Sequence, residues 1–128
     1  MGDRTRRTPL SGVCWIETER HLDTSIVRLH GEFDLSAEPR FSENLEPALD
    51  AATATLVLDL RGLTFMDSTG LRMLVSLNNR SERDGLDFAV LCDDGNVRNV
   101  LCETGLDGIL PVVDPSGRAR LRVALSAR

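Results

Sequence analysis

A serine hydroxyl occupies the predicted start of a helix. Ser68 lies in the segment LTFMDSTGL, residues 63–71, directly after a strand-like apolar run. The first turn of a helix has backbone N–H groups without internal partners, and the helix dipole favours an anion there. A phosphate carried by Ser68 would suit this position. The residues alone favour a simpler interpretation, in which Ser68 is an N-cap, and the two roles are compatible.

Carboxylates come close to this serine in the chain and in the predicted fold. Asp67 directly precedes Ser68, while Glu32 and Asp34 lie in the segment before Ser36, which is a predicted helix cap. Taken alone, these side chains are typical of solvated loop and turn carboxylates. Their spacing does not assign an acid–base pair.

Enzymatic chemistry has weaker support in the sequence. Ser68, His30 and Asp34 would be the members of a nucleophilic triad, but Ser68 lies in DSTG rather than in a G-x-S-x-G elbow. The 2 histidines do not supply the three protein ligands of a catalytic zinc. All 15 basic residues are arginines, which excludes lysine Schiff bases and P-loops. We therefore expect no catalytic residue, no metal site and no cofactor.

Strands and helices must position these side chains. The short runs 13–18 and 25–30 predict two antiparallel strands. Ser36 then caps a predicted helix, in which Pro47 is expected to cause a kink or a break. The apolar face of this helix consists of Phe41, Leu45 and Leu49.

The second half of the chain alternates between strand and helix patterns. Residues 55–60 (TLVLDL) predict a central buried strand, and residues 68–83 predict a helix that ends at Gly85. Such alternation indicates right-handed crossovers and an α/β fold with a mixed central β-sheet flanked by helices. Functional loops then gather beyond the carboxyl ends of the strands, at 31–36, 61–68 and 93–96. The remaining predicted elements are a strand over 86–92, a helix from the Asn96 cap to Gly105, a strand over 109–113, and a segment over 119–125 that fits a strand or a helix.

The helix over residues 68–83 has apolar residues beyond its predicted core face. Leu71, Leu74, Val75 and Asn78 form that face, and Met73 and Leu77 lie outside it. Two interpretations remain open: a wider apolar arc buried against the sheet, or an interaction surface.

Length and composition indicate one domain without a membrane segment. The 128 residues predict a flexible N-terminal tail over 1–11 and a folded domain over 12–128. The net charge of −5 disfavours direct binding to nucleic acid, and the chain has neither a signal-peptide h-region nor an apolar stretch of membrane-spanning length. Three cysteines without a C-x-x-C motif favour reduced thiols, so we expect a cytoplasmic protein. They are Cys14, Cys92 and Cys102.

Three segments together resemble the STAS domain of anti-sigma factor antagonists. They are VRLHGEFD (27–34), LVLDLRGLTFMDSTGL (56–71) and VLCETGLD (100–107). Their order and separation are similar to those of the family over residues 13–113, and DSTGL is the most specific of them. The resemblance implies a STAS domain over residues 12–128. Two features depart from the family pattern, namely Pro47 in the first helix and the alternation near the C-terminus.

The resemblance implies a mechanism called partner switching. The unphosphorylated antagonist binds an anti-sigma factor and releases the sigma factor, whereas phosphorylation by the anti-sigma factor serine kinase abolishes binding. Ser68 matches the phosphoacceptor, with Thr69 as a possible second acceptor. A phosphoserine phosphatase would reverse the modification, and the protein would be a monomer or weak homodimer. The switch-loop and partner-binding residues implied are Asp34, Asp67, Gly70, Arg72 and Met73.

A second role is compatible with the same fold. Other STAS proteins are scaffolds or adaptor subunits in stress-signalling or transporter-regulating assemblies. We expect no attached sensor or membrane domain, which favours the free-standing antagonist.

Overall fold

The computed structural model describes residues 6–52 and 54–113, which form one sheet with helices against it. Short 3-10 turns, η1 (Leu35–Ala37) and η2 (Leu106–Gly108), precede α1 and follow α3. The helices are α1 (Glu38–Ala51), α2 (Ser68–Arg83) and α3 (Asn96–Glu103). The strands are β1 (Arg6–Pro9), β2 (Cys14–His21), β3 (Thr24–Phe33), β4 (Thr55–Met66), β5 (Asp87–Leu91) and β6 (Val112–Val113).

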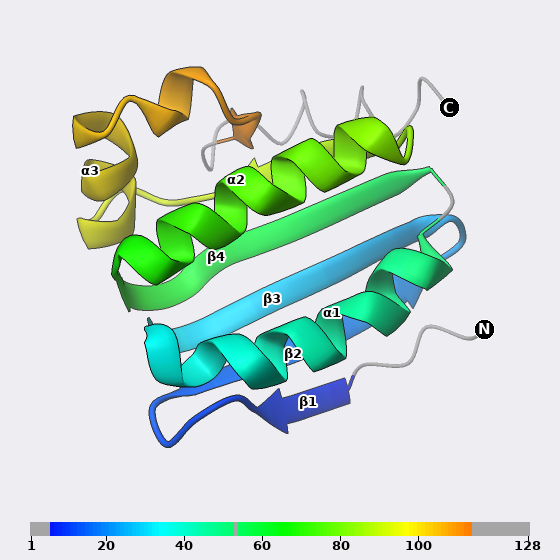
Figure 1. Cartoon of the computed structure of the whole chain (residues 1–128), viewed down its shortest axis with the longest axis horizontal. Coiled ribbons are helices and arrows are strands. Elements are labelled where there is room, and N and C mark those ends of the chain that lie inside the picture. The colour runs from blue at the N-terminus through cyan, green and yellow to red at the C-terminus, as the bar shows by residue number, and fades with distance from the viewer. Residues whose placement is uncertain (1–5, 53, 114–128) are drawn as a thin grey trace.

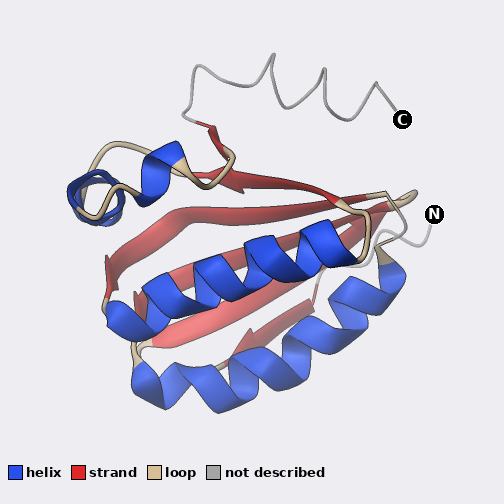
Figure 2. Cartoon of the chain, turned by 45° about the horizontal axis from the view of Figure 1, so that its top comes forward, coloured by secondary structure: helices blue, strands red, loops and turns tan. Residues whose placement is uncertain are grey.

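The strands lie in the sheet in the order in which they occur in the sequence. β1, β2 and β3 pair antiparallel, and β3, β4, β5 and β6 pair parallel. Helices α1 and α2 lie side by side over one face of this sheet, while α3 lies beside the carboxyl end of β4 (Figures 1 and 2). The expected α/β class with a mixed central sheet is confirmed.

The core lies between the sheet and α1 and α2. Alternate residues of β4 point into it, because successive side chains of a strand face opposite sides. Leu56, Leu58 and Leu60 are therefore buried under the helices. From the first helix, Phe41 and Leu49 are buried and Leu45 is partly buried against the same core, as the spacing predicts.

Helix α1 continues through Pro47, so of the predicted kink or break, the break is wrong. Proline removes one N–H group and crowds the carbonyl of the residue four positions earlier, Glu43. Both Pro47 and Glu43 are exposed, so water can satisfy that carbonyl. The buried face of the helix then outweighs the loss of one hydrogen bond.

Helix α2 has the predicted ends, Ser68 and Arg83, but a rotated buried face. Met73, Leu74 and Leu77 are buried, whereas Val75 is 37% exposed. Met73 and Leu77 are therefore buried in the core, as the first of the two interpretations has it, but the buried arc is rotated rather than widened. On the outside, the Arg80 guanidinium donates to both carboxylate oxygens of Glu46 at 3.0 and 3.1 Å and so links α2 to α1.

The tail predicted over residues 1–11 is wrong for residues 6–9, which form the edge strand β1. This strand pairs with β2 from Arg6 opposite Thr18 to Pro9 opposite Trp15. The composition of β1 does not predict a strand, because arginine and proline are typical of loose termini. The same residues also suit an edge strand, where charge and proline discourage pairing with another chain.

Several element boundaries also differ from the predicted ones. β2 extends to His21, so that only Leu22 and Asp23 form the turn, and β4 extends to Met66 rather than residue 60. β6 has only two residues. Asn96 is the first residue of α3, and Gly95 occupies the N-cap instead. The segment 119–125 lies outside the described residues.

Candidate functional site

The carboxyl ends of β3 and β4 meet at the start of α2. In the parallel register Phe33 lies opposite Met66, and the backbone N–H of Asp67 donates to the Phe33 carbonyl at 3.3 Å. Asp34 and Asp67 therefore follow two paired strand ends. The structure thus brings the two predicted carboxylates to the same edge of the sheet.

Asp67, and not Ser68, is the N-cap of α2. Its Oδ1 accepts hydrogen bonds from the backbone N–H groups of Thr69 at 2.9 Å and Gly70 at 3.4 Å. The N-cap prediction for Ser68 is wrong, since Ser68 is the first residue inside the helix. Its side chain is exposed, so its hydroxyl remains accessible.

Asp34 has the same local role at the end of β3. Its Oδ1 accepts hydrogen bonds from the backbone N–H and the hydroxyl of Ser36, at 2.9 and 2.6 Å, and caps η1. Hydrogen bonds from the Ser36 side chain and backbone hold the pKa of Asp34 below its usual range. The Ser36 cap predicted for α1 is therefore wrong, and this carboxylate stays ionised next to the edge that carries Ser68.

The other residues assigned by resemblance differ in exposure. Thr69 is 4% exposed, Met73 is 7% exposed and Gly70 is buried, whereas Arg72 is exposed. A Cβ atom at Gly70 would lie 2.0 Å from Cγ of Met66, so the helix start rests directly on the end of β4. Gly70 and Met73 thus support the site from beneath, and Arg72 is the one of these four with a side chain turned to solvent.

Two large apolar side chains near Ser68 were missed by sequence reasoning. Leu35 directly follows Asp34 and is 64% exposed, and Phe65 lies two residues before Asp67 and is 47% exposed. Both lie close in the chain to Asp34 and Asp67, at the edge that carries Ser68.

The nucleophilic triad is not assembled. His30 Nε2 lies 2.5 Å from Oε1 of Glu17, and its ring stacks on Trp15 with centroids 5.8 Å apart. A Cβ atom at the facing residue Gly62 would lie 2.4 Å from Nδ1 of His30, so the ring fits only over a glycine. His30 is therefore fixed within the sheet, and Asp34 is engaged by Ser36.

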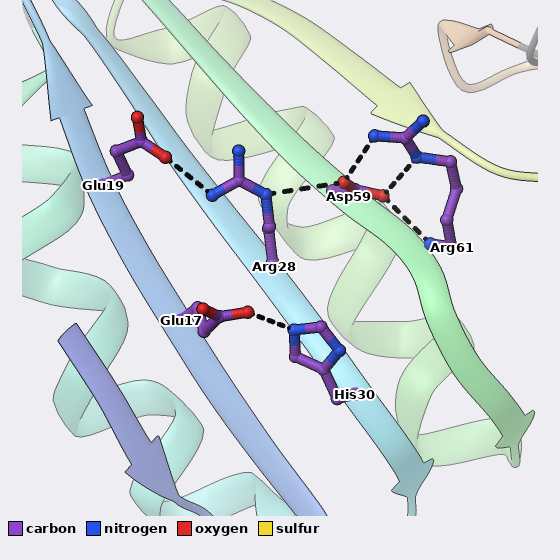
Figure 3. A network of polar contacts seen from close by, with 6 residues as sticks. All are labelled: Glu17, Glu19, Arg28, His30, Asp59 and Arg61. Carbon is purple, nitrogen blue, oxygen red and sulfur yellow. Dashed lines mark hydrogen bonds and ion pairs between the residues drawn. The ribbon is translucent and has the colours of Figure 1, made fainter. Parts of the chain in front are cut away.

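A polar network lies on the sheet face opposite α1 and α2 (Figure 3). Oxygen atoms of Asp59 accept from the Arg61 backbone N–H at 3.0 Å and from its guanidinium Nε and Nη2 at 3.0 and 2.9 Å. Arg28 lies between Asp59, at 3.7 Å, and Glu19, at 2.8 Å. We call these four residues the Asp59 network.

The arginines determine the charge state of Asp59. Burial raises the pKa of this carboxyl, but the hydrogen bonds and charge of Arg61, with the charge of Arg28, lower it below its usual range overall. Sequence reasoning missed the network because Asp59 lies inside the apolar run TLVLDL. The network is balanced in charge and internally paired, which is typical of a structural role.

The described residues hold no group of three or more side chains suited to bind a metal ion. None of the described helices has both the length and the apolar character needed to cross a membrane.

Comparison with known proteins gives a consistent set of relatives. A family model described as the STAS domain matches residues 16–119. The anti-sigma F factor antagonist of Paenibacillus polymyxa is 32% identical over 100 residues, which cover 77% of this chain and 86% of that protein. The anti-sigma-F factor antagonist RsfA of Mycobacterium tuberculosis is 29% identical over 107 residues, which cover 82% of this chain and 84% of that protein.

Solved structures give the same result. The crystal structure of an anti-sigma factor antagonist from Mycobacterium paratuberculosis matches with a TM-score of 0.74 and 27% identity, over 94% of this chain and 96% of that one. The anti-sigma factor antagonist SpoIIAA in its unphosphorylated form matches with a TM-score of 0.68 and 25% identity, over 84% of this chain and 95% of that one.

Proposed function

Because this chain belongs to the STAS domain family, we propose that it is an anti-sigma factor antagonist controlled by phosphorylation of Ser68. The relatives named above support the antagonist role, since they carry that description and are matched over most of their length. In this proposal the chain is a protein-binding regulator and a kinase substrate rather than an enzyme. It acts in the cytoplasm on transcription without contacting DNA.

One observation supports Ser68 as the phosphoacceptor. Its exposed side chain is the first of α2, and it lies at the edge where Asp34 and Asp67 follow two paired strands. A kinase can reach such a hydroxyl without unfolding the helix. Thr69, which is 4% exposed, is a poorer acceptor in the folded protein.

The local charges explain how one phosphate would oppose binding. A phosphate adds a charge of about −1.5 to −2. Helix N–H groups would ordinarily stabilise it, but those of Thr69 and Gly70 already donate to the Asp67 carboxylate. The phosphate would therefore lie beside a carboxylate that is already bound to them. In a buried interface such like-charge proximity costs several kcal/mol, which is about two decades of affinity or more.

The partner in this scheme is an anti-sigma factor that is also the serine kinase. Unphosphorylated protein binds it through the edge that carries Ser68, Leu35 and Phe65, and the sigma factor is released. A phosphoserine phosphatase restores the binding form. Arg72 is exposed one helical turn after Ser68 in α2 and would contact the same partner.

Phosphorylation is tested first. The purified protein is incubated with ATP and a lysate of its source organism, and its intact mass and phosphopeptides are measured. We expect a single phosphate on Ser68, lost in Ser68→Ala and kept in Ser76→Ala, which removes another exposed serine of α2. A phosphate that persists in Ser68→Ala would contradict the assignment.

Binding is tested with the kinase that this assay identifies. We expect Ser68→Ala to bind it like the unphosphorylated wild type, and Ser68→Asp to bind at least tenfold more weakly. Ser76→Asp adds the same charge about 12 Å along the helix and is the matched control. Equal affinities for all variants would refute the charge mechanism. An absence of phosphate, together with a large stable assembly in native sizing, would favour the scaffold role.

A further inference from the structure

A pocket lies far from Ser68, between the antiparallel strands and the second half of α1. It has a volume of about 170 Å³, and β1, β2, the start of β3 and α1 contribute its walls. These four elements lie together in the view of Figure 1. Ser25 in its wall and Asp34 are nine residues apart along β3 and its continuation, which corresponds to about 30 Å. The pocket is therefore separate from the proposed phosphorylation site.

The inner wall of the pocket is apolar. Ile16 is 1% exposed and Ala48 is 8% exposed, and the ring of Pro47 lies beside them. An engineered protein cavity of about 150 Å³ is large enough to bind benzene. A ligand body of that size would fit this pocket.

Two arginines give the pocket a positive charge. Arg6 and Arg20 line it, and the register places both on the helix-covered face, because Arg6 pairs with Thr18 and Arg20 with Ser25. Among the described lining residues the single acid is Glu19, and its carboxylate faces the opposite side of the sheet, 2.8 Å from Arg28 (Figure 3). The charge of the two guanidinium groups is therefore not neutralised by a carboxylate among those lining residues.

Ser25 supplies an independent sign of a ligand. Ser25 is one of the lining residues and is 2% exposed, and its buried Oγ has no hydrogen-bond partner within the protein. Buried hydroxyl groups are normally hydrogen-bonded, because an unpaired one has lost its contact with water. Ser25 is the cross-strand neighbour of Arg20, with Cβ atoms about 5 Å apart, so one ligand group can reach both.

We propose that this pocket binds a small organic anion, with one carboxylate or phosphate group on an apolar body the size of a benzene ring. The guanidinium groups of Arg6 and Arg20 pair with the anionic oxygens, because their planar donor geometry matches carboxylate and phosphate groups. The Ser25 hydroxyl donates to the same group, and Ile16, Pro47 and Ala48 contact the body.

Three probes test the proposal on the full chain. Benzoate, phenyl phosphate and the neutral analogue benzamide are titrated at constant ionic strength, and amide shifts are followed by two-dimensional NMR. We expect the two anions to shift the amides of Thr18, Ser25 and Ala48 in a saturable way, and benzamide to bind at least tenfold more weakly. The tighter of the two anions then identifies the group that the pocket prefers. Equal binding of benzamide would refute a role for charge.

Variants locate the binding. The double variant Arg6→Gln/Arg20→Gln should weaken binding at least tenfold, because it removes two positive charges that attract the anion, and Ser25→Ala should weaken it about threefold, because it removes a single uncharged donor. Arg83→Gln, which changes an exposed arginine at the end of α2, is the matched control and should not change the affinity. Unchanged amide spectra away from the pocket show that each variant is folded. Unaltered affinity in the folded double variant would overturn the proposal.

Discussion

Replacing Asp59 by alanine removes the group on which the Asp59 network depends. The carboxylate is 7% exposed, accepts three hydrogen bonds from Arg61 and lies 3.7 Å from Arg28. Hydrogen bonds to charged groups contribute about 1.5–3 kcal/mol each. The side chains of Arg28 and Arg61 are 30% and 36% exposed, so both guanidinium groups can turn to water. We therefore expect Asp59→Ala to lower the free energy of unfolding by about 2–4 kcal/mol in total.

Urea unfolding followed by circular dichroism at pH 7 measures this loss. Asp59→Asn keeps an oxygen that can accept from the Arg61 backbone N–H but loses the charge, so it should lose about 1–2 kcal/mol. Asp50→Ala removes an exposed carboxylate of α1 and should change stability by about 0.5 kcal/mol or less. Equal effects of Asp59→Ala and Asp50→Ala would refute the argument.

The pH dependence of the stability difference between wild type and the Asp59 variants tests the role of charge a second time. Arg61 and Arg28 lower the pKa of Asp59 in the folded protein, so the carboxylate stabilises the fold above its unfolded pKa of about 3.9. That stabilisation is lost as the pH falls through the lower folded pKa. The difference in free energy of unfolding between wild type and Asp59→Asn should therefore be largest near pH 7 and decrease progressively below about pH 4. A difference that stays constant down to pH 2.5 would show that charge is not its cause.

Three further predictions concern the start of α2 and the thiols. Asp67→Ala removes the N-cap and should lower the free energy of unfolding by about 1 kcal/mol in urea titrations. Asp67→Asn should keep most of that stability, because asparagine is an equally good N-cap. Gly70→Ala should cost about 1–3 kcal/mol in the same assay, because its methyl group meets the methionine beneath it, while Gly108→Ala, with open space around it, should be tolerated. Cys102 is exposed and the other two cysteines are buried, so mass spectrometry after alkylation of the folded protein at pH 8 should find one modified thiol, and three after unfolding.

The predictable part of the fold is the part with a strong apolar period. Helix α2 matches its predicted ends, and the run TLVLDL lies in the central strand β4, because both patterns bury a continuous face. β1 could not be predicted, since its four residues are polar or proline and acquire strand structure only by pairing with β2. The extension of β4 to Met66 likewise depends on its neighbour, β3.

For the candidate site, the sequence indicated which residues lie at the edge but not which hydrogen bonds they make. Ser68, Asp67 and Asp34 were identified from the chain, yet Asp67 and Ser68 are both good capping residues and the sequence does not decide between them. The decision comes from the hydrogen bond between the Asp67 N–H and the Phe33 carbonyl, which holds Asp67 in extended conformation next to β3. Asp59 shows the same limit, because its partner Arg28 lies on a different strand.

The strand order of the sheet has a consequence for how the protein is made. Within residues 6–52 and 54–113, each strand after β1 pairs with the strand that precedes it in the chain, so it finds that neighbour already synthesised when it leaves the ribosome. The β2–β3 hairpin closes through two residues and can form first, and each later strand adds at a single open edge after its helix. None of the six described strands has to insert between two others. Residues 24–33 thus offer a template for residues 55–66 before the second half of the chain exists, which limits the time that these apolar strands spend unpaired.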